Sequence, residues 1–197
     1  MALILGLDVA TTTGLAWYEP SSSLSSIKAG SIKAIGTSPE EKAESLAQQL
    51  VTMLKAERPD FVAIEEPLRN IKTYKKTIQT LYGPKVIHTV NPNQMLLYAL
   101  IGAVVSIIGA YRLPWQTIPP ATWRKSFFGA GFKPPVKITH KDGEDPQEEK
   151  LWKKAARDRC NQLKIKVTNV DMAEAVGIAF AASKTQTFKM LSMRAAA

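Results

Sequence analysis

The sequence predicts an α/β domain built on one mixed β-sheet, antiparallel on one side and parallel on the other, with helices on its faces. Its first part reads as three consecutive short strands, which is typical of an antiparallel meander. Short apolar runs and helices then alternate, as in parallel strands joined by crossover helices. The chain has 197 residues, 45% hydrophobic and 22% charged, which fits one folded domain.

The antiparallel strands come from the N-terminal segment. Residues 2–9 are an apolar run that is too short for a helix and contains Asp8 at its end. A threonine-rich turn at 11–14 precedes a returning strand over 15–18. After a serine-rich turn, residues 27–35 alternate weakly between apolar and polar. These three strands form the expected meander.

The parallel strands come from two short apolar runs, 61–65 and 114–118. Helix starts are marked by a capping residue followed by proline at the first helical position. This signal occurs at Ser38-Pro39, Asn91-Pro92 and Asp145-Pro146. The predicted helices cover 38–57, 91–111, 145–163 and, without the proline signal, about 168–184.

Two segments, 69–90 and 119–145, interrupt this order, and we expect irregular insertions that carry function. Residues 185–197 are expected to form a frayed tail, which leaves 1–184 as a single domain. The uncharged run 95–111 reaches the lower limit of length for a membrane span. Its glycines and serine favour a buried helix, which suits a subunit interface.

Cys160 is the only cysteine, so an internal disulfide is impossible and nothing points to an oxidising compartment. It shares one helical stripe with Trp152, Ala156 and Leu163, which predicts a core thiol. The N-terminal run lacks a basic region and reaches Asp8 too early for a signal peptide. We therefore expect a cytoplasmic protein with no membrane partner.

Carboxylates inside apolar elements form the candidate site. Asp8 and Glu65 each end a predicted strand, while Asp171 and Glu174 share one face of the last helix. Burying an ionised carboxylate is costly unless it is paired or binds a cation. The set predicts an Mg²⁺ site, with Mn²⁺ as a substitute, and two ions about 4 Å apart suit phosphodiester displacement. The two histidines lie far apart, which disfavours zinc.

Each carboxylate also has a simpler interpretation. Asp8 suits a role as acceptor for backbone N–H groups in the threonine-rich turn. Glu65 and Glu66 suit a solvated strand end. Asp171 suits a helix cap, with Glu174 facing water. The ordered set of four acids in this topology favours the metal site over these separate roles.

Three segments resemble the RuvC family of Holliday-junction resolvases, in the ribonuclease H-like superfamily, and most closely its phage and prophage members. They are ILGLDVATTTGLAWYE, DFVAIEEPL and VDMAEAVGIAFA, and the resemblance extends to about residue 184. It implies a ribonuclease H-like fold with a mixed five-stranded sheet. The family's metal-binding acids carry over to Asp8, Glu65, Asp171 and Glu174. The final D-x-x-E departs from the usual D-x-x-D, and Glu66 remains an alternative to Glu65.

The resemblance implies a crossover junction endodeoxyribonuclease of DNA recombination and repair. Such an enzyme resolves four-way junctions by paired symmetric nicks that leave 5′-phosphates. It also implies a homodimer, two Mg²⁺ ions per active site, and a bacterial or phage-infected host cytosol. Two alternatives stay open: a broader nuclease acting on forks, flaps or RNA, and a non-catalytic nucleic-acid-binding relative. Sugar-kinase and actin-like ATPases share the GLDVATTTG pattern but need a second domain.

The charge is uneven. Residues 1–67 carry a net charge of −4 and residues 68–197 a net charge of +13, which suggests a polyanionic partner. Acid-free basic stretches with aromatic residues occur at 69–85 and 121–141, although surface lysines are often only solvated. The expected DNA contacts are Leu68, Arg69, Lys72, Tyr74, Lys75, Lys76, Trp123, Arg124, Lys125, Lys150, Lys153, Lys154 and Arg157.

Two of these assignments are more specific. The resemblance gives Leu68, Arg69 and Tyr74 a wedge or stacking role at the junction centre. Either Lys150 or Lys154 is expected to stabilise the charge that develops on the scissile phosphate.

Overall fold

The computed structural model describes residues 2–67, 73–139 and 147–196. At its centre is a five-stranded sheet in the order β3-β2-β1-β4-β7. The strands are β1 (Ile4–Asp8), β2 (Thr12–Tyr18), β3 (Lys28–Lys33), β4 (Phe61–Glu65) and β7 (Trp115–Ile118). The pairs β3–β2 and β2–β1 are antiparallel, whereas β1–β4 and β4–β7 are parallel. The predicted mixed five-stranded sheet is confirmed.

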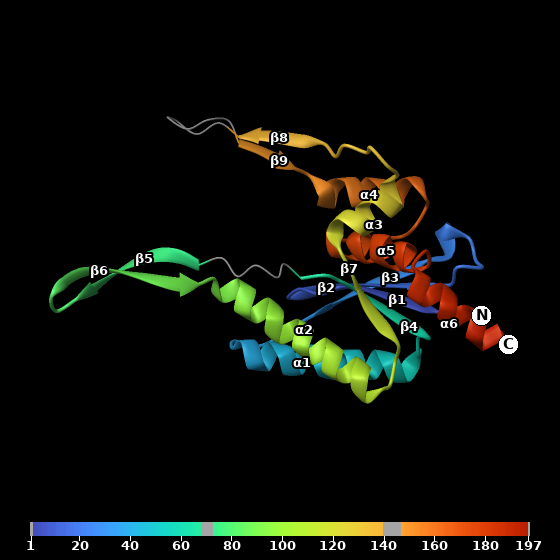
Figure 1. Ribbon diagram of the computed structural model, residues 1–197, viewed down its shortest axis with the longest axis horizontal. Coiled ribbons are helices and arrows are strands. Elements are labelled where there is room, and N and C mark those ends of the chain that lie inside the picture. Colours follow the sequence, from blue (N-terminus) through green and yellow to red (C-terminus); the bar gives the residue numbers. More distant parts are fainter. Residues whose placement is uncertain (1, 68–72, 140–146, 197) are drawn as a thin grey trace.

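Helices cover both faces of this sheet (Figure 1). Their bounds are α1 (Pro39–Ala56), α2 (Pro92–Ala110), α3 (Pro120–Phe128), α4 (Trp152–Gln162), α5 (Val170–Ala182) and α6 (Gln186–Ala196), with a 3-10 turn at Leu24–Ser26. Helices α1 and α2 pack together on one face. Helix α5 lies directly on the other face, and α3 and α4 pack against α5.

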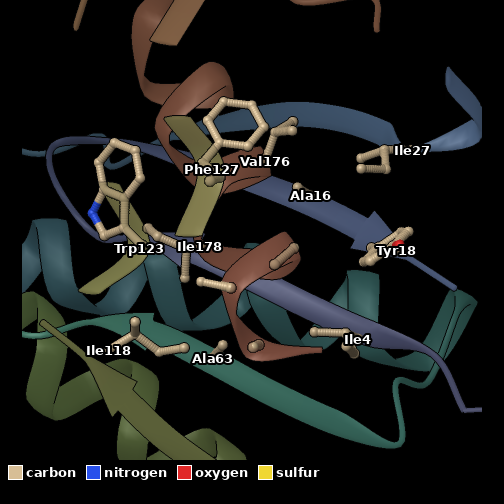
Figure 2. Close-up of a cluster of buried hydrophobic side chains, with 14 of the residues drawn as sticks. Ile4, Ala16, Tyr18, Ile27, Ala63, Ile118, Trp123, Phe127, Val176 and Ile178 are labelled. Atoms are coloured by element: carbon tan, nitrogen blue, oxygen red, sulfur yellow. The ribbon is translucent and has the colours of Figure 1, made fainter. Parts of the chain in front are cut away.

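The alternation of side chains along the strands separates the core into two halves. On β1, Leu5 and Leu7 join the cluster under α1 and α2, whereas Ile4 joins the cluster under α5. Figure 2 shows this second cluster, which also holds the rings of Trp123 and Phe127 from α3. Helix α3 is thereby anchored to the core through its aromatic residues.

Glycine lets α5 approach the sheet closely. A Cβ added to Gly6 of β1 would lie 2.6 Å from the carbonyl oxygen of Ala175 and 2.6 Å from the amide nitrogen of Ala179. A Cβ added to Gly14 of β2 would meet the backbone of Asp171. The two glycines therefore set the distance between the sheet and the helix that carries two of the candidate acids.

Two of the three cap–proline signals predict their helices correctly. In α1 the Ser38 hydroxyl accepts a hydrogen bond from the Glu41 amide, and the Glu41 carboxylate accepts one from the Ser38 amide. In α2 the Asn91 side chain accepts a hydrogen bond from the Asn93 amide. Each helix has proline at its first position, as expected.

The third signal gives a wrong helix start. Residues Gln147–Lys150 form strand β9, which pairs with β8 (Val136–Thr139), and α4 begins only at Trp152. The Leu151 amide continues this ladder with a hydrogen bond to the Pro135 carbonyl. Hairpin pairing with the preceding strand β8 outweighs the local preference for a helix. Asp145-Pro146 lies outside the described residues.

The two expected irregular insertions also contain regular structure. The first holds a hairpin of β5 (Thr73–Thr80) and β6 (Gly83–Val90). The second holds α3 and strand β8. Strands β8 and β9 pair as a second hairpin. The β5–β6 and β8–β9 hairpins both project from the body of the domain as arms (Figure 1). Most side chains of these strands are exposed, including Val136 and Ile138 on β8, so they do not belong to a buried core.

The C-terminal segment and α2 also differ from expectation. The residues expected to fray form helix α6 through Ala196, whose buried Phe188 contacts the edge of the Phe61 ring. Among the described helices, α2 alone is long and apolar enough to cross a membrane by length and composition. It packs on α1 through Leu100, Val104 and Ile108. Helix α2 is therefore buried on one side only.

Candidate metal centre and nucleic-acid surface

Three elements bring the candidate acids to one edge of the sheet. Asp8 ends β1 and Glu65 ends β4, and the two strands run parallel with Leu7 opposite Ile64. Both carboxylates therefore leave the sheet at the same edge. Helix α5 begins nearby and carries Asp171 and Glu174 in its first two turns.

The carboxylates of Asp8, Asp171 and Glu174 form a compact cluster. Each offers one oxygen, and these oxygens lie within 4.8 Å of one another. Asp8 is 7% exposed and Glu174 is 4% exposed, while Asp171 is half-buried. Three acids this close together and this poorly solvated repel one another.

Burial raises the pKa of Asp8 to about 8, and the charges of Glu174 and Glu65 add to the shift. Burial also raises the pKa of Glu174. Without a cation, the Asp8 carboxyl therefore holds a proton near neutral pH. A divalent ion would relieve both the repulsion and the desolvation, and an all-oxygen donor set suits Mg²⁺ or Mn²⁺. These residues can hold a divalent metal.

The simpler interpretations of these acids do not match the structure. The Thr13 hydroxyl, not Asp8, accepts the Ala10 amide and closes the turn after β1. The cap of α5 is Asn169, whose side chain accepts the Met172 amide. Glu174 is buried and does not face water. The structure therefore favours a shared role for Asp8, Asp171 and Glu174 over these separate roles.

Glu65 stands at the margin of this cluster. Its charge raises the pKa of both Asp8 and Glu174, yet the three-acid group does not include it. The indole Nε1 of Trp123 donates a 2.7 Å hydrogen bond to Glu65 Oε1 and orients this carboxylate. Its electrostatic coupling to Asp8 favours Glu65 over Glu66 as the fourth acid.

The expected DNA contact by Trp123 is wrong. Its side chain is fully buried under α5, and a Cβ added to Gly177 would lie 2.6 Å from its ring. A ring packed in this way is not available to stack on bases. Its role in the structure is to position Glu65.

Two cations approach the acids. Lys153 Nζ lies 2.9 Å from Asp171 Oδ1 and 3.6 Å from Glu174 Oε2. Burial lowers the pKa of Lys153, but the hydrogen bond to Asp171 and the charges of the acids outweigh it and raise the pKa overall. A guanidinium nitrogen of Arg124 lies 4.0 Å from Glu174 Oε1.

The expected choice between Lys150 and Lys154 for a cation at the site does not match these contacts. Lys150 belongs to β9 rather than to the helix. Lys153 is the lysine whose ammonium group meets the acids. The sequence did not single it out because all three lysines were assigned to the same basic helix.

The remaining expected DNA contacts lie on several elements. Lys75 and Lys76 are exposed on β5, Lys125 is exposed on α3, and Lys154 and Arg157 are exposed on α4. Leu68, Arg69 and Lys72 lie outside the described residues, as does the side chain of Tyr74.

The tip of the β5–β6 hairpin lies within the basic, aromatic stretch 69–85 that the sequence singled out, but the exposure of its two large side chains was not predicted. Leu81 and Tyr82 are almost fully exposed there. Their signal was a pair of large apolar residues directly before Gly83, at a turn between two largely polar segments.

Cys160 and its neighbours match expectation. Cys160 and Ala156 are buried in the core, and burial raises the pKa of the Cys160 thiol to about 12. The thiol is protonated at neutral pH and is not a nucleophile.

No protein-family model and no curated protein matches this sequence. Among solved structures, T. thermophilus RuvC in complex with Holliday junction substrate aligns with TM-score 0.60 and 15% identity, covering 92% of this chain and 92% of that chain. A second Thermus thermophilus RuvC structure aligns with TM-score 0.57 and 15% identity, covering 96% of each chain. The chain therefore has the ribonuclease H-like fold of RuvC, which confirms the resemblance at the level of the fold.

Proposed function

We propose that this protein is a metal-dependent endodeoxyribonuclease that resolves four-way DNA junctions. The observation that carries the proposal is the buried group of Asp8, Asp171 and Glu174, with Glu65 beside it, at the edge of the sheet. Its surroundings make Asp8 and Glu174 costly to ionise without a cation. One solved structure that shares this fold over 92% of its length is a RuvC in complex with Holliday junction substrate.

The four acids would hold two Mg²⁺ ions, for which Mn²⁺ substitutes. Such ions supply activation of a water nucleophile and stabilisation of the leaving 3′-oxygen, which leaves a 5′-phosphate. Asp8 would lie at the centre of the donor set, because the charges of Glu65, Asp171 and Glu174 all act on it. Trp123 would keep the Glu65 carboxylate turned to the same edge.

Lys153 would assist from within the site. Its ammonium group is held against Asp171 and Glu174 and is placed to neutralise charge that develops on the scissile phosphate. Arg124 is oriented by the rings of Trp123 and Trp152 as well as by Glu174. No protein nucleophile is needed, and the buried Cys160 thiol is unsuited to act as one.

Exposed cations would bind the phosphates of the junction arms. Lys125, Lys154 and Arg157 are exposed on α3 and α4, the two helices that pack against α5. Lys75 and Lys76 lie on the projecting β5–β6 arm. Phosphate contacts of this kind position DNA without reading its sequence.

Resolving a junction takes two nicks in opposite strands, so we propose a homodimer that supplies two sites. The side of α2 facing away from α1 is uncharged, and Met95 is exposed on the helix. Such a surface suits a partner of the same kind. The proposed protein works in the bacterial or phage-infected cytosol, in recombination and repair.

A cleavage panel tests this function. The substrates are a four-way junction, a three-way fork, a linear duplex and an RNA–DNA hybrid, each with Mg²⁺ or Mn²⁺. Nicks confined to the four-way junction support a resolvase, whereas equal cleavage of forks indicates a broader branched-DNA nuclease. Tight binding without metal-dependent cleavage of any substrate would contradict the enzyme and indicate a binding protein.

A further inference from the structure

A cavity of about 760 Å³ lies beside the acids, between α3, the loop 129–132 and the start of α4. Arg124, Lys125, Phe132 and Trp152 contribute to its wall, and none of the described residues that line it is acidic. Its volume falls in the range of small-ligand sites. Its charge and its aromatic rings suit a nucleotide.

Arg124 borders both the cavity and the group of acids. The Arg124 guanidinium carbon lies 4.8 Å from the centre of the Trp152 ring, and the same group reaches Glu174. Trp152 directly precedes Lys153, whose ammonium group contacts Asp171. A DNA strand with its scissile phosphate at the acids would therefore bring a neighbouring nucleotide to the mouth of the cavity.

The wall offers open aromatic surface. One face of Phe132 is stacked on Phe128, with ring centres 4.5 Å apart and planes 12° apart. Phe132 is nevertheless 42% exposed. The Trp152 ring lies 6.2 Å from the Phe132 ring at 46°, so the two rings do not fill the space between them by stacking on each other.

The loop that borders the cavity leaves it open. Gly129 has φ +95° and Gly131 has φ +80°, in the region that favours glycine. A Cβ at either position would meet nothing within 4 Å. The residue between them, Ala130, adds only a methyl group. The loop therefore provides backbone but almost no side chain to occupy the space.

We propose that this cavity captures one unstacked base of the cleaved strand, adjacent to the scissile phosphate. Phe132 and Trp152 provide the stacking surface, and Arg124 and Lys125 hold the attached phosphate. Because every base has a π-face, such stacking accepts any base. The cavity selects for local unstacking at a crossover rather than for sequence. This inference rests on the proposed junction nuclease and names a determinant of its structure selectivity.

The test is a binding cycle with abasic junctions, measured without divalent ions. Four-way junctions carry a single abasic site at successive positions around the crossover, and each is titrated with wild type and with Phe132→Ala. At one or two adjacent positions, loss of the base should weaken wild-type binding by about tenfold, as removal of one stacked base does. The same loss should weaken Phe132→Ala binding by less than about threefold, since the ring is already absent.

Trp115→Ala is the matched control. Trp115 is 39% exposed, similar to Phe132, but lies at the start of β7, the end opposite Ile118 and Glu65. Removal of the base should still weaken junction binding by Trp115→Ala about tenfold, as it does for wild type. Equal losses for wild type and Phe132→Ala at every position would overturn the inference.

Cleavage of the intact junction with Mg²⁺ is scored separately. One outcome is metal-dependent nicking, with base removal weakening binding equally in wild type and Phe132→Ala. That outcome would refute the base-capturing role of the cavity and leave the proposed function standing. The opposite outcome is a smaller effect of base removal in Phe132→Ala than in wild type, without any nicking. That outcome would support base capture by the cavity and refute the nuclease. A wild type that does not bind the junction at all would overturn both.

Discussion

The fold strongly alters the ionisation of Asp8. Its pKa rises from 3.8 to about 8, chiefly through burial and then through the charges of Glu174 and Glu65. Between these values, the folded protein keeps a proton that the unfolded chain releases. The free energy of unfolding of the metal-free protein therefore falls as the pH rises through this window.

The first prediction concerns Asp8→Asn in the presence of a chelator. The variant should lose less stability than wild type between pH 5 and pH 8, by more than about 1 kcal/mol, the equivalent of one pKa unit. Urea denaturation at the two pH values measures this difference. Because the pKa of Glu174 is also raised, some pH dependence should persist. An unchanged pH dependence in the variant would contradict the buried, repelling cluster.

Lys153 carries the second prediction. Lys153→Met should slow single-turnover cleavage by about 100-fold, because one preorganised positive group at the reacting phosphate is lost. Junction affinity should fall much less, since the other exposed cations proposed to bind the arms remain. Lys154→Met is the control, because Lys154 is the next residue along α4 and is exposed. Similar rates for the two variants would contradict the role given to Lys153.

At this scale the sequence predicts the acids better than the cations. Asp8, Asp171 and Glu174 stand out because each is an acid among apolar neighbours, and the structure brings them within 4.8 Å of one another. Lys153 and Lys154 are adjacent on α4, and their side chains point in different directions. The sequence does not show which of the two turns toward the acids. The burial of Trp123 depends on contacts with Gly177 that are distant in the chain.

Among the elements, α5 determines the geometry of the site through its contact with the sheet. The carbonyl of Ala175, one residue beyond Glu174, is among the atoms that a side chain at Gly6 would meet. Any side chain at Gly6 would therefore have to displace α5 together with its two acids.

The third prediction follows from this contact. Gly6→Ala should destabilise the protein by about 1–3 kcal/mol, as overpacking of a core does, and should reduce metal-dependent cleavage. Gly30→Ala is the control, because Gly30 lies in β3 of the same sheet and an added Cβ there meets nothing within 4 Å. Thermal unfolding and the cleavage rate measure the two effects. Equal behaviour of the two variants would refute the close contact.

The elements themselves were predictable where local signals decide them. The capping box of α1 and the apolar run of β4 lie entirely within their own segments. The pairing of Val136 with Lys150 closes a hairpin whose strands are mostly polar or exposed, and it delays the start of α4 to Trp152. Local patterns contain no information on such a pairing.

At the scale of the whole molecule, the exposed side of α2 is the proposed contact between two copies. Gly102 lies in the middle of this helix, and an added Cβ there would meet nothing within 4 Å. A change at Gly102 therefore alters the surface of α2 without disturbing its packing on α1.

The fourth prediction is that wild type sediments as a dimer and Gly102→Glu as a monomer, because the substitution places a charge on an apolar contact. Gly102→Ala adds a methyl group without charge and improves helix propensity, so it should remain dimeric. Sedimentation velocity of the three proteins measures this. A Gly102→Glu protein that stays dimeric would place the interface elsewhere.

We propose that the acids at the edge of the sheet hold the metal of a paired junction nuclease. A supercoiled plasmid with an extruded cruciform tests it in one assay, because a single nick gives an open circle and paired nicks give a linear product. With Mg²⁺, wild type should produce linear plasmid directly, and Asp8→Asn should bind the cruciform without cutting it. Cutting without added metal in the presence of a chelator, or cutting retained by Asp8→Asn, would contradict the claim.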